Sequence, residues 1–258
     1  MTARVSWISF TPVKGLALEH VEETELLESG PQGDRRFYLV DANDRLVNNK
    51  GGRRGALQLI HARYDDASAE LTLHLPDGRE LSGRATEGDE LQTNFHSRPK
   101  PARLIAGPWN ETLSELVGEP LRLVAAALGA PDRGRGGAAT LLAAASLEAL
   151  AGELGVSEVD GRRFRMNFGI DGLEPHAEDG WIGKRIAIGA AVVVPQGNVG
   201  RCAITTQNPE TGKADLDTLN ALAAYRGALE TTEPLPFGVH AAVAQTGRVR
   251  VGDPVKPL

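Results

Sequence analysis

The sequence predicts a mainly β fold with a few α-helices. Short strand-like segments separated by turn residues dominate the first hundred residues, and one pair of them reads as a β-hairpin. Helical periodicity is confined to three short stretches later in the chain. With 258 residues, the chain is long enough for one large domain or for two small domains that share an interface.

The strands of the first hundred residues are predicted from apolar and β-branched runs bounded by turn residues. Four of them cover residues 4–10, 20–27, 37–41 and 57–64. A hairpin is expected over residues 71–81, where leucines alternate with threonine and histidine before a Pro-Asp-Gly turn. Proline presets φ and glycine tolerates left-handed geometry, so the two arms are expected to pair.

Helices are predicted in the second part of the chain. Over residues 109–118 the apolar side chains fall on one face and a glycine suits the left-handed stop, so this helix is expected to mark a domain boundary. A strand over residues 121–128 and a glycine-rich loop over residues 132–137 follow. Two more helices are expected over residues 146–154 and 215–226, the latter with leucines on one side.

Composition excludes several classes of protein. A net charge of −6 gives no general affinity for nucleic acid or for anionic membranes. The longest apolar segment, residues 138–151, is interrupted by polar residues and is shorter than the roughly 20 residues of a spanning helix. The N-terminal apolar run is too short and too polar for a signal peptide, so we expect a cytoplasmic protein that does not bind a membrane.

The single cysteine, Cys202, limits the metal chemistry of the chain. One thiol cannot form an internal disulfide, an iron–sulfur cluster or an ordinary zinc site, so a redox metal would have to bring most of its own ligands. A thiolate binds soft metals, and the neighbouring Arg201 lowers the cost of its charge. The alternative is that Cys202 is a small buried apolar residue without chemistry.

Four segments place cations or donors where an anion could bind. Lys14 lies in a tight loop at a strand end, and Arg36 lies between a glycine turn and the next strand. Residues 162–170 alternate, so that Arg165 and Asn167 could share the polar face of a strand. Ser146 at a helix start is either an N-cap or part of a phosphate site. For the segments of Lys14 and Arg36 and for residues 162–170, the alternative is an ordinary solvated surface.

Other familiar sites are not indicated. The histidine and acids of residues 176–181 match no zinc spacing, and a structural role is the simpler interpretation. The chain has no G-x-S-x-G motif for a serine hydrolase and no G-x-G-x-x-G or P-loop pattern for a nucleotide. No pyridoxal phosphate site is identified.

Taken together and in order, seven segments resemble the motifs of the MOSC family, named for the C-terminal domain of molybdenum cofactor sulfurase. The resemblance implies a β-barrel MOSC domain over residues 116–258 and a β-barrel-like N-terminal partner domain over residues 1–115. It is greatest for the amidoxime-reducing branch of the family. The matching segments are Pro12-Val13-Lys14-Gly15, Gly33-Asp34-Arg35-Arg36-Phe37, Ala145-Ser146-Leu147, Phe164-Arg165-Met166-Asn167, Glu178-Asp179-Gly180-Trp181, Arg201-Cys202-Ala203-Ile204-Thr205-Thr206 and Val251-Gly252-Asp253-Pro254-Val255.

The resemblance assigns roles residue by residue. It implies that Cys202 is both the catalytic residue and the ligand of molybdenum, whose other sulfurs come from a pterin dithiolene. Nine residues would hold the molybdenum cofactor: Lys14, Gly15, Arg36, Ser146, Arg165, Asn167, Gly200, Arg201 and Thr205. The chain departs from the family where Gly15 replaces a serine, where Met166 replaces a proline, and where Lys50 stands near a common arginine.

The function that the resemblance implies is reduction of N-hydroxylated compounds such as hydroxylamines, amidoximes or N-hydroxylated bases. Electrons would come from a separate donor protein of the ferredoxin or flavin reductase type, and Asp179 or His240 is a candidate proton relay. The alternatives are a carrier that binds the molybdenum cofactor without turnover, and an interaction barrel in which Cys202 has no chemistry.

Overall fold

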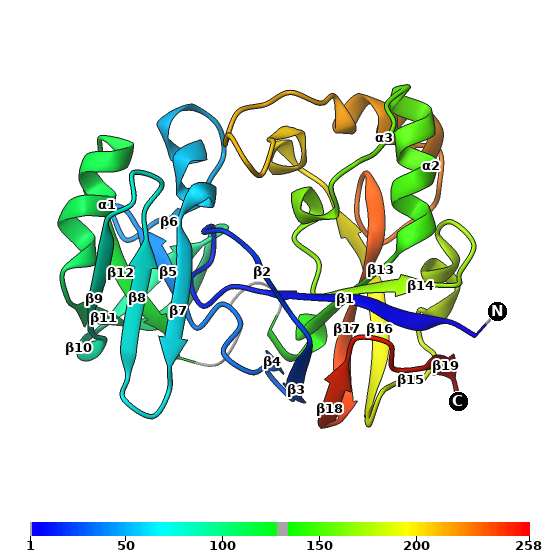
Figure 1. Ribbon diagram of the computed structural model, residues 1–258, viewed down its shortest axis with the longest axis horizontal. Helices are drawn as coiled ribbons and strands as arrows, with labels where there is room; N and C mark the ends of the chain where they lie inside the picture. The colour runs from blue at the N-terminus through cyan, green and yellow to red at the C-terminus, as the bar shows by residue number, and fades with distance from the viewer. Residues whose placement is uncertain (1, 128–133) are drawn as a thin grey trace.

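A computed structural model describes residues 2–127 and 134–258, and it is mainly β with a few helices. Figure 1 shows two bodies side by side, one built around β5–β12 and α1, the other around β13–β19, α2 and α3. The predicted fold class is therefore confirmed. Within the described residues, no helix is long and apolar enough to cross a membrane.

The first body contains two antiparallel sheets and one α-helix. Its five-stranded sheet has the order β10-β11-β12-β5-β6, and its three-stranded sheet has the order β7-β8-β9. The bounds are β5 (Phe37–Val40), β6 (Leu46–Val47), β7 (His61–Asp65), β8 (Glu70–His74), β9 (Glu80–Arg84), β10 (Thr86–Phe95), β11 (Arg98–Ala106), β12 (Arg122–Ala126) and α1 (Trp109–Val117).

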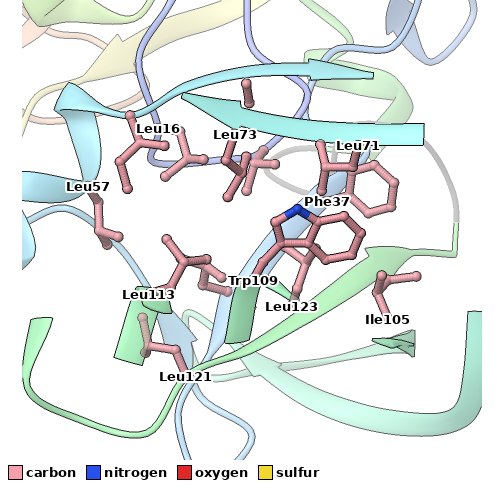
Figure 2. Packing of buried hydrophobic residues seen from close by; sticks show 14 of the residues in the cluster. Leu16, Phe37, Leu57, Leu71, Leu73, Ile105, Trp109, Leu113, Leu121 and Leu123 are labelled. Carbon is pink, nitrogen blue, oxygen red and sulfur yellow. The ribbon is translucent and has the colours of Figure 1, made fainter. Parts of the chain in front are cut away.

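Trp109 lies at the centre of the core of the first body. Figure 2 shows its indole between Leu71 and Leu73 on one side and Leu123 on the other. Its side chain is fully buried, and its Nε1 donates to the carbonyl oxygen of Leu81 at 3.2 Å. The alternating leucines of the hairpin thus face the core, as their period predicts.

The hairpin and the first predicted helix are both confirmed. Leu73 pairs with Leu81 across β8 and β9, and Gly78 takes the left-handed conformation in the turn between them. The helix α1 ends at Gly118, which is also left-handed with φ of 77°.

The second body is built on an eight-stranded sheet with the order β19-β15-β16-β17-β13-β14-β1-β2. The two ends of this sheet approach each other, because the Val255 N–H donates to the Ala3 carbonyl at 2.8 Å and Arg4 bridges to Pro254. A small sheet, β18-β3-β4, extends it. The bounds are β1 (Arg4–Phe10), β2 (Glu19–Val21), β3 (Glu23–Leu27), β4 (Gly30–Pro31), β13 (Ala139–Ala143), β14 (Phe168–Asp171), β15 (Ile186–Ile188), β16 (Ala191–Gly200), β17 (Pro236–Gln245), β18 (Gly247–Arg250) and β19 (Val255–Pro257).

Strand pairing interleaves the two halves of the sequence. The strand β1 pairs with β14, while β12, which follows residue 115, pairs with β11 and β5. The chain therefore starts in the second body, builds the first, and returns. The domain division at residues 115 and 116 remains a prediction.

Two α-helices and five 3-10 helices complete the described structure. Both later helices are confirmed, as α2 (Ala144–Leu154) and α3 (Thr218–Arg226). The 3-10 helices are η1 (Gly52–Leu59), η2 (Gly134–Gly137), η3 (Gly161–Phe164), η4 (Ala177–Trp181) and η5 (Ala203–Thr206). The predicted strand over 121–128 is confirmed as β12 except at its end. Residue 128 and the start of the loop predicted over 132–137 lie outside the described residues.

Two predicted strands are wrong in part. Residues 162–170 form η3 and then β14, because Arg165 takes a left-handed φ of 55° between them and breaks the alternation. Residues 57–59 belong to η1, in which Leu57 turns into the core of the first body instead of continuing β7. In both cases a short 3-10 helix buries apolar residues, Leu57 in η1 and Phe164 in η3, at a sequence spacing that also fits a strand.

Candidate functional site

Cys202 is exposed at the end of β16, where it precedes η5. The Thr205 N–H and hydroxyl both donate to the Cys202 carbonyl, at 3.0 Å and 3.1 Å. The backbone is therefore fixed while the thiol remains accessible. The interpretation of Cys202 as a buried apolar residue is wrong, because its side chain is not in the core.

Arg201 anchors the cysteine to two neighbouring elements. Its Nη1 donates to the Phe164 carbonyl at 2.8 Å, its Nε donates to the Phe237 carbonyl at 2.9 Å, and its Nη2 lies 2.9 Å from the Met166 sulfur. The guanidinium also lies 5.3 Å from the centre of the Phe164 ring. Arg201 thus ties the end of β16 to β17 and to η3.

Gly200 allows the end of β16 to lie close to the segment of Glu233 and Pro234. A Cβ on this residue would lie 2.9 Å from the Pro234 carbonyl oxygen and 3.0 Å from the Glu233 Cβ. Any other side chain would push the end of β16 away from this segment. Gly200 therefore shapes the backbone that presents Cys202.

Replacing Arg201 with lysine is expected to lower the free energy of unfolding by about 1–3 kcal/mol, because one ammonium cannot serve acceptors held by a planar fork. Urea unfolding followed by circular dichroism measures this. Arg36→Lys, on an exposed arginine, is the matched control and should change the value by less than about 0.5 kcal/mol. Equal stability of both variants would contradict the anchoring role.

The loop over residues 11–16 brings the first half of the chain to Arg165. The Arg165 Nη2 donates to the Leu16 carbonyl at 2.7 Å. Gly15 takes φ of +93°, which suits glycine, and the Lys14 ammonium lies 5.7 Å from the centre of the Phe95 ring. Because Arg201 also contacts η3, the polypeptide around Lys14, Gly15, Arg165 and Cys202 is joined by a continuous set of contacts.

We call the contact between the loop over residues 11–16 and the segment around Arg165 the seam. A buried acid, Asp34, organises it. Its carboxylate accepts from the Thr11 N–H at 3.0 Å, from the Arg35 Nη1 at 2.7 Å and from the Asn167 Nδ2 at 3.0 Å. The Arg35 Nη2 also donates to the Arg165 carbonyl at 2.8 Å. Sequence analysis included Asp34 and Arg35 in the Gly33–Phe37 motif but assigned the cofactor contact to Arg36. The burial of Asp34 and Arg35 is not visible in any local period of the sequence.

The remaining candidates lie against other protein groups. Arg36 pairs at 3.0 Å with the exposed Asp66 and stacks on the half-buried Tyr64, both in the first body. Asn167 is buried, and its Oδ1 accepts from the Thr140 hydroxyl at 2.9 Å. Thr205 is buried with its hydroxyl 2.7 Å from that of Thr218. Their assignment to the cofactor remains a prediction.

Ser146 does not cap a helix. It is the third residue of α2, whose N-cap is Ala143. Its hydroxyl accepts from the His176 N–H at 2.9 Å and lies 3.5 Å from the Glu178 carboxylate. The N-cap interpretation is therefore wrong, and the serine joins α2 to η4.

The two proton-relay candidates also have protein partners. Asp179 accepts from the Asn198 Nδ2 at 2.8 Å and pairs with Arg226, and the His240 Nδ1 lies 2.9 Å from the Gly136 carbonyl. No group of three or more His, Cys, Asp or Glu in residues 2–127 and 134–258 converges on a metal site. The donor available to a soft metal is the Cys202 thiol.

Two cavities differ in the charge of their lining. One of about 170 Å³ lies between the bodies and is lined by Arg162, Arg165 and Gln58 among others. One of about 580 Å³ has the carboxylates of Glu23 and Asp66 in its wall, as well as further acids, which disfavours a phosphate there. The smaller cavity has Arg162 and Arg165 in its lining, but Glu210 lines it as well and pairs with Arg162.

The fold and the site define a class: a two-body, mainly β protein that presents one exposed thiol at a strand end beside a basic seam. Residues 2–119 match the profile of the MOSC N-terminal beta barrel domain, and residues 131–256 match that of the MOSC domain. The two matches span nearly the whole sequence. The chain belongs to the MOSC family and has both of these domains.

Relatives of known sequence and structure agree with this membership. The mitochondrial amidoxime-reducing component 1 of Xenopus laevis is 28% identical, over 97% of this chain and 81% of that protein. The protein of the same name from Mus musculus is 36% identical over 45% of this chain and 35% of its own length. The crystal structure of the YUAD protein from Bacillus subtilis covers 99% of this chain and 94% of that chain with a TM-score of 0.50 and 13% identity, which indicates a shared fold alone.

Proposed function

We propose that the chain binds the molybdenum cofactor through Cys202 and reduces N-hydroxylated compounds, such as hydroxylamines, amidoximes or N-hydroxylated bases. The observation that carries the proposal is the exposed Cys202 thiol, held at a strand end next to a seam with basic side chains from both halves of the sequence. The amidoxime-reducing relatives support the substrate class.

The donor set fits such a cofactor. A thiolate is the soft ligand that a sulfur-rich molybdenum centre takes, and Lys14 and Arg165 are donors suited to an anionic pterin phosphate. In this proposal Lys14, Gly15 and Arg165 would contact the group, while Gly200 and Thr205 fix the backbone of Cys202. Arg36, Ser146, Asn167 and Arg201 are further candidates, and like Arg165 they also bond to protein groups.

When bound, the cofactor supplies two-electron oxygen-atom transfer. For a hydroxylamine, one equivalent consumes two electrons and two protons and yields the amine and one water. The protein's own residues bind and orient: Cys202 provides the ligand, Arg201 fixes its backbone, and the seam compensates negative charge. The electrons come from a separate donor protein of the ferredoxin or flavin reductase type, acting on a cytoplasmic enzyme.

Expression in a host that synthesises the cofactor tests the proposal. Molybdenum by mass spectrometry and released pterin by fluorescence should be close to stoichiometric with the chain, and a reduced viologen dye should support reduction of an aromatic amidoxime. Protein from a host unable to make the cofactor is the control and should be inactive. Absence of molybdenum would refute the proposal, and metal without turnover would favour the carrier.

A further inference from the structure

Polar side chains that are buried or half-buried cluster where α2, α3 and η4 meet. The two α-helices lie side by side in Figure 1 and contact each other. The cluster consists of Ser146 from α2, His176 and Glu178 at η4, and Tyr225 from α3. The proposed function gives none of these residues other than Ser146 a role, and a buried polar cluster requires an explanation because each unpaired group is costly.

Glu178 is the fully buried acid of this cluster. One carboxylate oxygen, Oε1, lies 3.5 Å from the Ser146 hydroxyl, and the other, Oε2, has no hydrogen-bond partner among the described residues. Burial raises the pKa of Glu178 to about 7, against smaller opposing contributions from backbone hydrogen bonds, among them one with Ala143. The acid is therefore neutral below pH 7 and titrates near physiological pH.

His176 is the second unusual group. Its Nε2 lies 3.3 Å from the Tyr225 hydroxyl, and its Nδ1 is buried without a partner in the described part of the chain. Burial, and then the charge of Arg226, lower the pKa of His176 to about 4. A neutral imidazole cannot offset an ionised Glu178, so ionisation of the acid adds an uncompensated charge to the cluster.

The first route from this cluster to Cys202 passes through Asp179, the neighbour of Glu178. Asp179 accepts from Asn198, which lies two positions before the end of β16. It also pairs with Arg226, whose Nε donates to the Pro236 carbonyl at 2.8 Å. Asp179 therefore contacts β16 directly through Asn198, and it contacts the start of β17 through Arg226.

The second route passes through ring contacts. The His176 ring lies 5.6 Å from the Phe237 ring, in an edge-to-face arrangement. The carbonyl of Phe237 accepts from the Arg201 guanidinium, which precedes Cys202. Movement of the histidine would therefore reach the cysteine through one aromatic residue and one arginine.

We infer that Glu178 is a positioning residue for Cys202: the neutral acid leaves the Asp179–Arg226 pair intact and holds the thiol in place, and ionisation of the acid loosens it. The inference rests on the proposed function, because the positioned thiol is the proposed metal ligand. The positioning of Cys202 by Glu178 also applies to the metal-free chain, because the contacts that carry it are between protein groups.

The direction of the effect follows from the charges around Glu178. Asp179 repels an ionised Glu178, and Arg226 attracts it, so the new carboxylate competes with Asp179 for the guanidinium. Tyr225 and His176 are neutral at pH 7, since the phenol has a raised pKa of about 12 and the imidazole a lowered one of about 4. The strands β13 and β16 contain no charged residue, and β17 contains only His240, which faces Gly136.

Thiol labelling measures the position of Cys202 directly. Cys202 is the only cysteine of the chain and is exposed, so a disulfide reagent such as dithionitrobenzoate reports on that thiol alone. Rates are measured between about pH 5.5 and about pH 8.5 for the metal-free wild type and for Glu178→Gln. The thiolate is the reactive form in both proteins, so the ratio of the two rates isolates the effect of residue 178.

The ratio of wild-type to Glu178→Gln rates should be constant in acid and rise about two- to threefold with a midpoint near pH 7, the range of a modest coupling free energy. The matched control is Glu174→Gln, an exposed glutamate on the same segment, which should follow the wild type. A ratio independent of pH would overturn the inference.

Carbon NMR of the wild type provides a second measurement if Glu178→Gln fails to fold. The Glu178 carboxyl resonance should titrate near pH 7, and titration near pH 4.5 would overturn the inference. Neither measurement needs molybdenum or turnover. An inactive protein with the expected labelling ratio would therefore refute the proposed function and leave the positioning role standing.

Discussion

Cys202→Ser is expected to abolish reduction of N-hydroxylated compounds, with kcat at least about 100-fold below the wild type. Substitution of residues that hydrogen-bond to a metal ligand commonly lowers metal affinity or activity by about 10–100-fold. Loss of the ligand itself should lower the activity further. A serine hydroxyl is a hard, neutral donor at pH 7 and does not replace a soft thiolate. Steady-state kinetics with a reduced viologen, alongside molybdenum content, measure the effect.

The fold should be unaffected by this change. The contacts that fix residue 202 use its backbone carbonyl, which serine retains, and its side chain is exposed. The matched control is Ala203→Ser, on the next exposed residue, which should keep most of the activity. Full activity in Cys202→Ser would exclude the thiol as the metal ligand.

Asp34→Ala is expected to lower the free energy of unfolding by about 3–5 kcal/mol, because it leaves a buried arginine without its carboxylate. The Asp34 side chain is fully buried and the Arg35 side chain is 10% exposed. The change also removes the acceptor of the Thr11 N–H and of the Asn167 amide. Urea unfolding followed by circular dichroism measures the loss.

Asp66→Ala is the matched control for this prediction. Asp66 also pairs with an arginine, Arg36, but both side chains are more than a third exposed, at 49% and 41%. Solvent screens such a pair, so the expected change is within about 1 kcal/mol. If Asp34→Ala were no more destabilising than Asp66→Ala, Asp34 would not organise the seam.

Local patterns predicted the elements that local chemistry determines. The hairpin over 71–81 and the helix over 109–118 have turn and stop residues in the sequence, and both are confirmed. The strand expected over 162–170 was wrong in part, because Arg165 adopts a left-handed conformation at the end of η3 and its side chain bonds to Leu16, which is distant in sequence. A period of two cannot report such a contact.

The candidate site divides in the same way. The sequence marks Cys202 as a candidate ligand for a soft metal but leaves a buried position open, and the structure exposes its thiol. Asp34 and Glu178 could not be found by period, because each is buried by elements that are distant from it in sequence, Asp34 against Asn167 and Glu178 against Ser146. Choosing between Arg35 and Arg36 likewise needs the left-handed backbone of Arg35, which turns its side chain toward Arg165.

The placement of β1 in the second body has a consequence for biosynthesis. This strand is synthesised before the first body, yet one of its two ladder partners, β14, is made only after the whole first body. Ala3 must wait longer still, for Val255 near the other end of the chain. The first body can thus acquire its core during translation. The second body, which carries Cys202, is completed later, when β14 and Val255 pair with the strand made before them.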